Sequence, residues 1–204
     1  MDDEPPEVGL EKPSWWVRRD SVRRLLLVCL ALIGGSVALL QMLGLSSVGH
    51  GHRSPWLTKD HLTSIERAIT AFYNEYGYMP DPWGGLSPVD ARVDTSDPVG
   101  QALLNILLGR ESGPVMQNPK QIAFLTLPTG TKKKGGLVFD AHGKVKGAFD
   151  AWGRGYQVLI DYDGDETLSP PSDSGRSSPL HRCRAAGYSL GPDGTGGRNA
   201  IRCW

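Results

Sequence analysis

Three aspartates at two-residue spacing, Asp161, Asp163 and Asp165, are the residues whose pattern most clearly suggests chemistry. Carboxylates spaced in this way form the first half of a calcium loop, where oxygen ligands surround the ion at about 2.3 to 2.6 Å. The second half departs from that pattern, because Glu166 stands where an EF-hand has glycine and Ser172 where it has a bidentate glutamate. The sequence leaves two interpretations open, a calcium site or a solvated acidic turn, and predicts no other cofactor.

Two of the three cysteines, Cys183 and Cys203, lie in the polar C-terminal part of the chain, whereas Cys29 lies in an apolar run. Cysteines of a small domain pair in an oxidising compartment and stay reduced in the cytosol. The topology of the chain therefore decides between a disulfide and two free thiols.

Signs of catalysis are few. The sequence has no His-Glu-x-x-His motif and no cysteine and histidine in a context typical of a nucleophile and its base. Lys132-Lys133-Lys134 precedes two glycines but lacks the Gly-Lys-Ser/Thr order of a phosphate-binding loop, so we interpret it as a solvated charged turn. The 22 basic and 22 acidic residues balance, which argues against a nucleic-acid partner. We expect a protein that is not an enzyme.

An uncharged apolar run of 21 residues, Leu25 to Leu45, precedes the polar part of the chain. At about 1.5 Å per residue a helix of this length spans a hydrocarbon core of roughly 30 Å, so the run predicts a transmembrane helix. No charge follows it until Arg53, whereas four arginines precede it: Arg18, Arg19, Arg23 and Arg24. The positive-inside rule then places the N-terminus in the cytoplasm. A cleaved signal peptide is the alternative, but its apolar segment is usually shorter.

Composition divides the chain into four predicted segments. They are a cytoplasmic tail at 1–24, the transmembrane helix at 25–45, a flexible linker at 46–57 and an exported domain at 58–204. In a bacterium this topology predicts a single-pass protein of the inner membrane with a periplasmic C-terminal domain.

The exported segment opens with an amphipathic helix pattern. Thr58 can cap a helix that continues to about Tyr76, because apolar residues recur at three- and four-residue steps. The predicted stripe consists of Leu62, Ile65, Ile69, Phe72, Tyr73 and Tyr76. Gly77 and Pro80 end the helix, and the stripe is expected to pack on a sheet.

Beyond Gly136 the pattern changes to short runs typical of strands, separated by turns. The runs cover residues 137–140, 144–149, 156–160 and 187–190. Residues 81–136 form a long connection that we expect to cover the core rather than to form it, with helical pieces near 98–108 and 118–125. The predicted fold class is α+β, with an N-terminal transmembrane helix followed by a helix packed on a small antiparallel β-sheet.

Four short motifs follow the apolar run in order. They are Tyr73-Asn74-Glu75-Tyr76-Gly77-Tyr78-Met79-Pro80, then Asp150-Ala151-Trp152-Gly153-Arg154-Gly155-Tyr156, then Tyr188-Ser189-Leu190-Gly191-Pro192-Asp193-Gly194, and finally Ile201 to Trp204. In this order they resemble the pilin superfamily, and most closely the major pseudopilin of bacterial type II secretion systems. The resemblance implies that the helix and sheet are pilin-like.

The resemblance also implies a function. We expect a membrane-anchored, pseudopilin-like structural or accessory protein of a type II secretion or type IV pilus-like system. Its partners would be the inner membrane and proteins of the secretion or pilus machinery, and its oligomeric state stays open. The alternative is a free-standing anchored domain that binds a ligand or the cell wall.

Two departures from the family refine this expectation. Pilins begin the membrane helix with a Gly-Phe-Thr-Leu-x-Glu-like prepilin-peptidase site, whereas this chain has Arg23-Arg24-Leu25-Leu26, which favours an accessory protein over a filament subunit. The family often fixes its C-terminal loop with calcium through carboxylates, whose positions here are Asn199 and Ala200. We therefore expect a disulfide between Cys183 and Cys203 to fix that loop in place of calcium.

Overall fold

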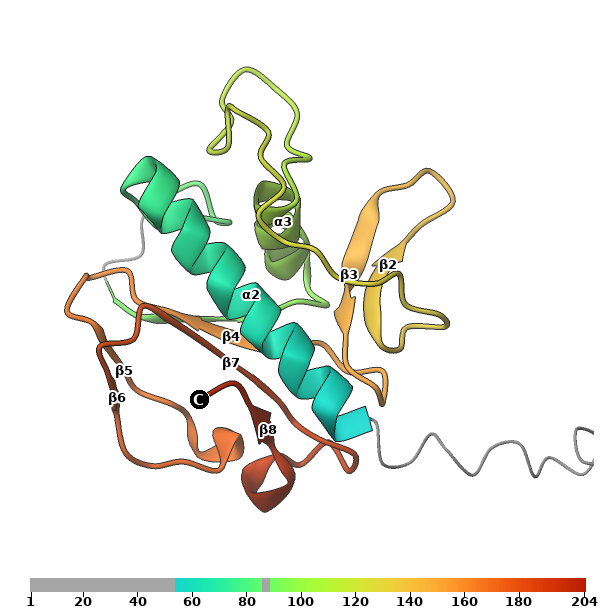
Figure 1. Ribbon diagram of the computed structural model, residues 1–204, viewed down its shortest axis with the longest axis vertical. Coiled ribbons are helices and arrows are strands. Elements are labelled where there is room, and N and C mark those ends of the chain that lie inside the picture. Colours follow the sequence, from blue (N-terminus) through green and yellow to red (C-terminus); the bar gives the residue numbers. More distant parts are fainter. Residues whose placement is uncertain (1–53, 86–88) are drawn as a thin grey trace, which may run out of the picture. The chain divides into compact units, whose positions relative to one another are not determined.

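The protein was analysed as a computed structural model that describes residues 54–85 and 89–204 (Figure 1). These residues belong to one compact unit, Gly51–Trp204. Its central sheet is antiparallel and has the strand order β1-β4-β7-β8. The strands are β1 (Ala91–Asp94), β4 (Gln157–Ile160), β7 (Ala185–Ser189) and β8 (Ile201–Arg202).

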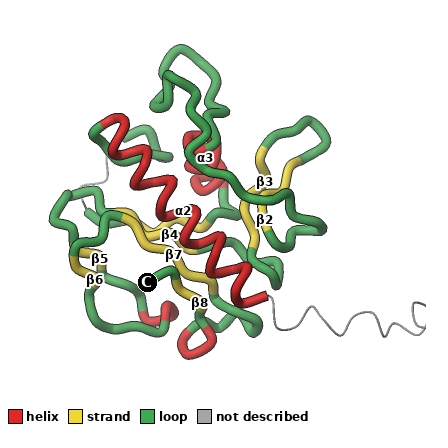
Figure 2. The backbone as a smooth tube through the Cα atoms, viewed as in Figure 1, coloured by secondary structure: helices red, strands yellow, loops and turns green. Residues whose placement is uncertain are grey.

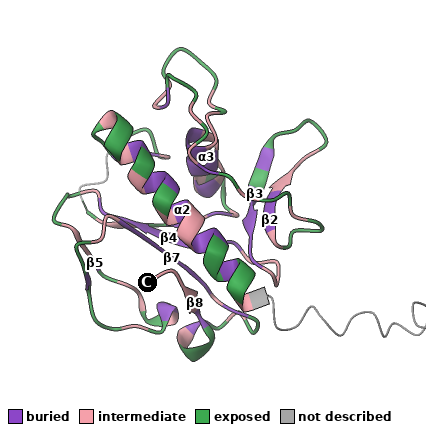
Figure 3. Ribbon diagram, in the orientation of Figure 1, coloured by how far each residue is buried: buried purple, intermediate pink, exposed green. Residues whose placement is uncertain are grey.

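Helix α2 (Ser54–Tyr76) lies across this sheet (Figure 1). Its buried and exposed residues alternate along the ribbon with helical spacing (Figure 3), and the apolar side chains at Leu62, Ile65, Ile69 and Phe72 are completely or almost completely buried. The helix approaches β7 closely, because a Cβ added at Gly187 would lie 3.0 Å from Leu62 Cδ2. Gly77 ends the helix in the left-handed conformation, where its N–H donates to Tyr73 O.

Helix α3 (Pro98–Leu107) and the hairpin of β2 (Gly136–Phe139) and β3 (Val145–Phe149) complete the main core. Proline at the start of α3 suits a first turn, whose N–H groups have no partner within the helix. Loops connect most of the elements (Figure 2). A smaller cluster lies beside β5 (Thr167–Leu168) and β6 (Leu180–His181) and contains Leu159, Leu168, Leu180 and Ala186. Two short 3-10 helices, η2 (Ser172–Ser174) and η3 (Gly197–Asn199), precede β6 and β8.

The predicted fold class needs correction in its membrane part. No helix within residues 54–85 and 89–204 is long and apolar enough to cross a membrane. Helix α2 has 23 residues but is amphipathic, and α3 has only 10. The predicted span at 25–45, together with the predicted tail before it, lies outside the described residues. What the structure supports is an α+β unit with a small antiparallel sheet.

Three local predictions were also wrong. Thr58 does not cap α2, which begins at Ser54; instead the buried Thr58 Oγ1 accepts a hydrogen bond from Ala151 N at 3.4 Å. Residues 118–125 form no helix. The connection at 81–136 contributes to the core, because α3 buries four apolar side chains: Leu103, Leu104, Ile106 and Leu107. The sequence predicted only a segment that covers the core, because a short apolar run does not reveal what it packs against.

A buried polar pair holds α2 to β4. His61 Nδ1 and the Tyr156 hydroxyl share a hydrogen bond of 2.8 Å, and both residues are almost inaccessible to solvent. Burial raises the pKa of Tyr156, so its hydroxyl stays protonated and can donate to a neutral imidazole. His61 Nε2 is buried and has no hydrogen-bond partner among the described residues. Burial therefore lowers the pKa of His61, because an imidazolium would bring an unpaired charge into the core.

Replacing Ile69 with Ala should lower the free energy of unfolding by about 2 to 5 kcal/mol, because it removes a fully buried side chain from the interface between α2 and the sheet. Urea denaturation measures this difference. Asn74→Ala, at an exposed position of the same helix, is the control and should change stability by less than about 0.5 kcal/mol. A loss at Ile69 as small as that of the control would contradict the packing.

His61 should make the domain less stable at low pH. Its folded pKa lies below the ordinary value of 6.5, so the unfolded chain binds the proton more tightly. The stabilising contribution is complete above that value and is lost as the pH falls through it toward the folded pKa. The free energy of unfolding of wild type and of His61→Gln, which does not titrate at this position, should change equally with pH above pH 7.5. Below pH 6.5 that of wild type should fall more steeply. Parallel pH profiles would show that His61 titrates normally.

Candidate functional site

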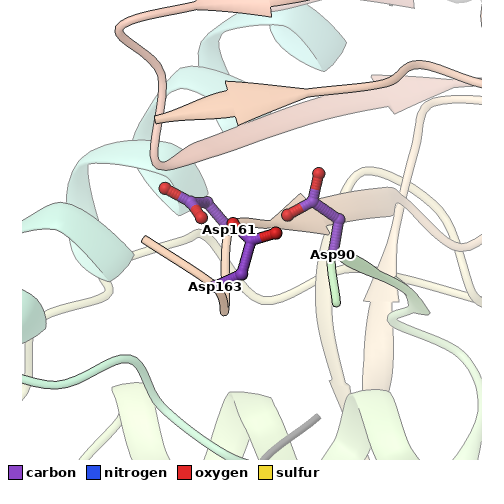
Figure 4. Close-up of side chains that lie close together, drawn as sticks. All are labelled: Asp90, Asp161 and Asp163. Atoms are coloured by element: carbon purple, nitrogen blue, oxygen red, sulfur yellow. The ribbon is translucent and has the colours of Figure 1, made fainter. Parts of the chain in front are cut away.

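The acidic run folds into a turn whose carboxylates meet an aspartate from another segment. Asp90, Asp161 and Asp163 each offer one carboxylate oxygen, and these atoms all lie within 4.8 Å of one another (Figure 4). Asp161 directly follows β4, and Asp90 directly precedes β1. Ala91, the first residue of β1, pairs with Ile160, the last residue of β4, in the antiparallel ladder. The residues just outside this pair, Asp90 and Asp161, therefore lie at the same end of the sheet.

Asp161 organises the turn that follows it. Its Oδ1 accepts a hydrogen bond from Gly164 N at 2.7 Å, and its Oδ2 accepts one from Glu166 N at 3.0 Å. Asp163 Oδ1 accepts from Asp165 N at 3.1 Å. Side-chain acceptance of nearby backbone N–H groups is the usual way in which aspartate stabilises a turn. The acidic turn predicted from the sequence is thus held together by its own first two carboxylates.

Electrostatics at this group favour a cation or a proton. Burial, together with the neighbouring charges of Asp163 and Asp161, raises the pKa of Asp90 to about 6. Asp90 Oδ1 is buried and accepts no hydrogen bond within the described residues. The pKa of Asp161 is also raised, chiefly by burial, although its two backbone hydrogen bonds oppose the shift. Three carboxylates this close repel one another unless charge is neutralised.

The ligand set differs from the one that the sequence predicted. Asp165 is not among the three carboxylates within 4.8 Å of one another, and its Oδ1 accepts a hydrogen bond from Thr167 N at 2.6 Å. Asp90 replaces it and could not be found from spacing, since it precedes a strand, β1, that the sequence pattern did not reveal. Calcium binds six to eight oxygens, so Asp90, Asp161 and Asp163 would supply part of a coordination shell. Calcium at this group and a solvated acidic turn both remain as interpretations.

The two cysteines of the predicted disulfide are free thiols in the structure. Cys203 Sγ accepts a hydrogen bond from Gly187 N at 3.0 Å, while the Cys183 thiol donates to Ala185 O at 3.1 Å. Burial raises the pKa of both thiols. The disulfide stays a prediction, and mass mapping without reductant decides it.

One motif was overlooked in the sequence. Gly187-Tyr188-Ser189-Leu190-Gly191 has the Gly-x-Ser-x-Gly spacing of a hydrolase nucleophile. The structure places Ser189 at the end of β7, fully buried, where its hydroxyl donates to Asp150 Oδ2 at 2.5 Å and accepts from Gly191 N at 3.0 Å. A nucleophilic serine needs an exposed Oγ and a histidine base. Ser189 instead bonds directly to a carboxylate, so its role is structural.

Asp150 joins two of the motifs on which the resemblance rests. Its Oδ1 accepts hydrogen bonds from the backbone N–H groups of Trp152, Gly153 and Arg154 at 2.7 to 2.9 Å, and its Oδ2 accepts from Ser189. Arg154 then reaches the next turn, where Nη1 donates to Gly191 O at 3.0 Å. The turn before β4 and the turn after β7 are therefore connected by side chains that each motif supplies.

Comparison of the chain with models of protein families, with curated proteins and with solved structures found no match. The functional argument therefore rests on the residues and on their arrangement.

Asp90→Asn should stabilise the calcium-free domain at pH 7.5 by about 1 to 2 kcal/mol, because it removes a charge whose folded pKa is raised to about 6. In wild type this penalty declines as the pH falls below about 6 and is gone near the ordinary value of 3.8, since the folded state takes up the proton more readily than the unfolded state. Thermal unfolding at several pH values measures the effect.

Calcium should make wild type more stable than Asp90→Asn if the ion occupies this group of carboxylates. Millimolar calcium would raise the melting temperature of wild type and leave Asp90→Asn nearly unchanged. Asp165→Asn is the matched control, because Asp165 lies outside the group. An identical melting temperature with calcium and with chelator would identify the group as a solvated acidic turn.

Proposed function

We propose that this protein is a pseudopilin-like structural or accessory component of a type II secretion or type IV pilus-like system. The observation that carries the proposal is the junction between Asp150 and Ser189. Each of these residues belongs to a motif that resembles the pseudopilin pattern, and their hydrogen bond gives both motifs one structural purpose. If the two motifs shared only their composition with the family, there would be no reason for them to contact each other in the folded chain.

The arrangement of helix and sheet also supports the proposal. An amphipathic α2 packs along an antiparallel sheet, and an aromatic group gathers at its C-terminal end. Phe72 lies 4.8 Å from Tyr76 and 5.6 Å from Phe124, measured between ring centroids. The Tyr76 hydroxyl donates to Asn118 Oδ1 at 2.7 Å, which ties the helix end to the loop that follows α3. The helix-end motif thus anchors the loop that follows α3.

A structural role agrees with the way the buried polar groups are used. Asp150, Ser189 and Thr95 direct their hydrogen bonds to backbone groups or to one another. Thr95 Oγ1, for example, donates to Ala148 O and accepts from Tyr156 N. Groups committed in this way stabilise turns and strands rather than a transition state. We infer that the protein acts by its shape and surfaces and is not an enzyme.

Replacement of the prepilin-peptidase site by Arg23-Arg24-Leu25-Leu26 makes an accessory subunit the better form of the proposal than a filament subunit. Those residues lie outside the described part of the chain. Localisation at the bacterial inner membrane, with a periplasmic domain, stays a prediction from the sequence.

A groove of about 460 Å³ favours the second candidate function, a domain that binds a ligand or the cell wall. Trp83 lines it with its side chain 43% exposed, and Asn105 and Arg110 face the same space. Exposed aromatic rings beside polar side chains are common in ligand sites. Glu111 and Gln117 also line the groove, but they bond to the backbone of the surrounding loop.

Photo-crosslinking in the native host tests the proposal. A photoreactive amino acid at Arg67, an exposed position in the middle of α2, should crosslink to secretion or pilus subunits, and deletion of the gene should reduce secretion or pilus assembly. The same group at Val115, on the loop after α3, is the control for position. Unimpaired secretion together with stabilisation of the purified chain by cell-wall glycan would instead establish the ligand-binding function.

A further inference from the structure

Exposed apolar and basic side chains gather around the first turn of α2. We call this surface the Trp-Lys face; it comprises Trp56, Leu57, Lys132, Lys133, Lys134, Lys146 and Arg154. Leu57 Cδ2 lies 3.7 Å from where a Cβ on Gly135 would be, and Lys134 similarly approaches Gly153. Thr58 adds a hydrogen bond to the 150–153 turn. Three segments distant in sequence thus meet at this end of α2.

The apolar members of the face, Trp56 and Leu57, are exposed to solvent rather than packed into the core of the described residues. Trp56 is 74% exposed and Leu57 is 41% exposed, whereas the apolar stripe that follows them on α2 is buried. An indole held in water costs free energy that burial would recover. A large exposed aromatic beside an aliphatic side chain therefore indicates a surface with an external partner.

The basic members of the face form no ion pair with any carboxylate of residues 54–85 and 89–204. The ion pairs within the described residues involve Arg92, Lys120 and Arg184, none of which belongs to the face. Lys133, Lys146 and Arg154 converge instead on a pocket of about 580 Å³. The pocket also contains Asp94, but that carboxylate already accepts hydrogen bonds from Ser96 and Gln157.

Internal contacts hold two of these cations in place. Arg154 Nη1 donates to Gly191 O and to Pro192 O, at 3.0 and 3.2 Å. The Lys133 ammonium lies 6.0 Å from the centroid of the Phe149 ring. Two negative charges lie nearby, on Asp94 in the pocket and on the exposed Asp60, so the five basic side chains leave a positive excess. Its electrostatics match an anionic surface.

We propose that the Trp-Lys face docks on the surface of an anionic phospholipid bilayer, with headgroup phosphates in the pocket of Lys133, Lys146 and Arg154. Tryptophan prefers the headgroup layer, and adjacent lysines are attracted to anionic lipid with about a fivefold gain in partition each. A protein partner fits less well, because lysine is depleted from the centres of protein interfaces. This inference is independent of the secretion role.

Lysine footprinting on the full chain tests the proposal. The chain is placed in nanodiscs of zwitterionic lipid alone or with roughly a third anionic lipid, and the acetylation rate of each lysine is measured by mass spectrometry. Lys132, Lys133, Lys134 and Lys146 should react at least about fivefold more slowly on the anionic discs. Lys120, on the loop after α3, should react equally on both and serves as the internal control.

Variants that leave residues 1–53 unchanged separate this face from any contribution of the N-terminal segment. Trp56→Ser combined with Leu57→Ser should abolish the protection of the lysines, with circular dichroism confirming the fold. Replacing Lys132, Lys133 and Lys134 with Gln should abolish the protection of Lys146. The triple replacement of Lys120, Arg182 and Arg198 with Gln changes the net charge by the same amount as the lysine triple variant. It should preserve the protection of Lys146.

Two results would overturn the assignment. Equal acetylation rates on the two kinds of disc would show that the face does not engage anionic lipid. Protection of Lys133 and Lys146 by inorganic phosphate alone, to the same extent as by anionic discs, would assign the pocket to a soluble anion instead. Protection that disappears in about 1 M salt would support the proposal, because screening weakens contacts between exposed charges.

Discussion

Burial of one face of α2 against β7 and β8 of the central sheet is the constraint on which the rest of the structure depends. Leu62, Ile65, Ile69 and Phe72 are shielded from water only because the central sheet lies beneath them. The lack of a side chain at Gly187 allows the helix to approach β7 closely. Once α2 is seated, α3 and the β2-β3 hairpin extend the same core, and the turns at both ends of the helix acquire fixed positions. A helix of this amphipathic kind would have little stability by itself.

Polar contacts in the core then specify which turns meet. Asp150 uses both carboxylate oxygens, one for its own turn and one for Ser189, so removing either partner would leave a buried group unsatisfied. His61 and Tyr156 connect α2 to β4 in the same way, at the cost of an unpaired Nε2. This use of polar groups explains how a Gly-x-Ser-x-Gly sequence can occur without hydrolase chemistry. The serine is an element of a junction between turns.

Charges that remain unbalanced mark the surfaces where function is expected. The carboxylates of Asp90, Asp161 and Asp163 lie together at the shared end of β1 and β4, where burial and then their mutual repulsion raise the pKa of Asp90. Lysines and an arginine gather beside the first turn of α2, where they form no ion pair within the described part of the chain. Opposite charges that could have neutralised each other are thus held apart by the fold. Each surface is one where we expect an external ion of the opposite sign to bind.

The sequence by itself determined the elements whose signals are local. The stripe of α2, its end at Gly77 and the strand runs near β2, β3, β4 and β7 follow from periodicity and turn residues. The same reasoning located the acidic turn but not Asp90, the third carboxylate of the group. It identified the two C-terminal cysteines but not the separate hydrogen bonds that their sulfur atoms form. Only the tertiary structure brought Asp90 to Asp161, Ser189 to Asp150 and the lysine-bearing turn to Leu57. The physical reason is that such groups are set by strand pairing and helix packing between segments far apart in the chain, and residue spacing carries no record of those contacts.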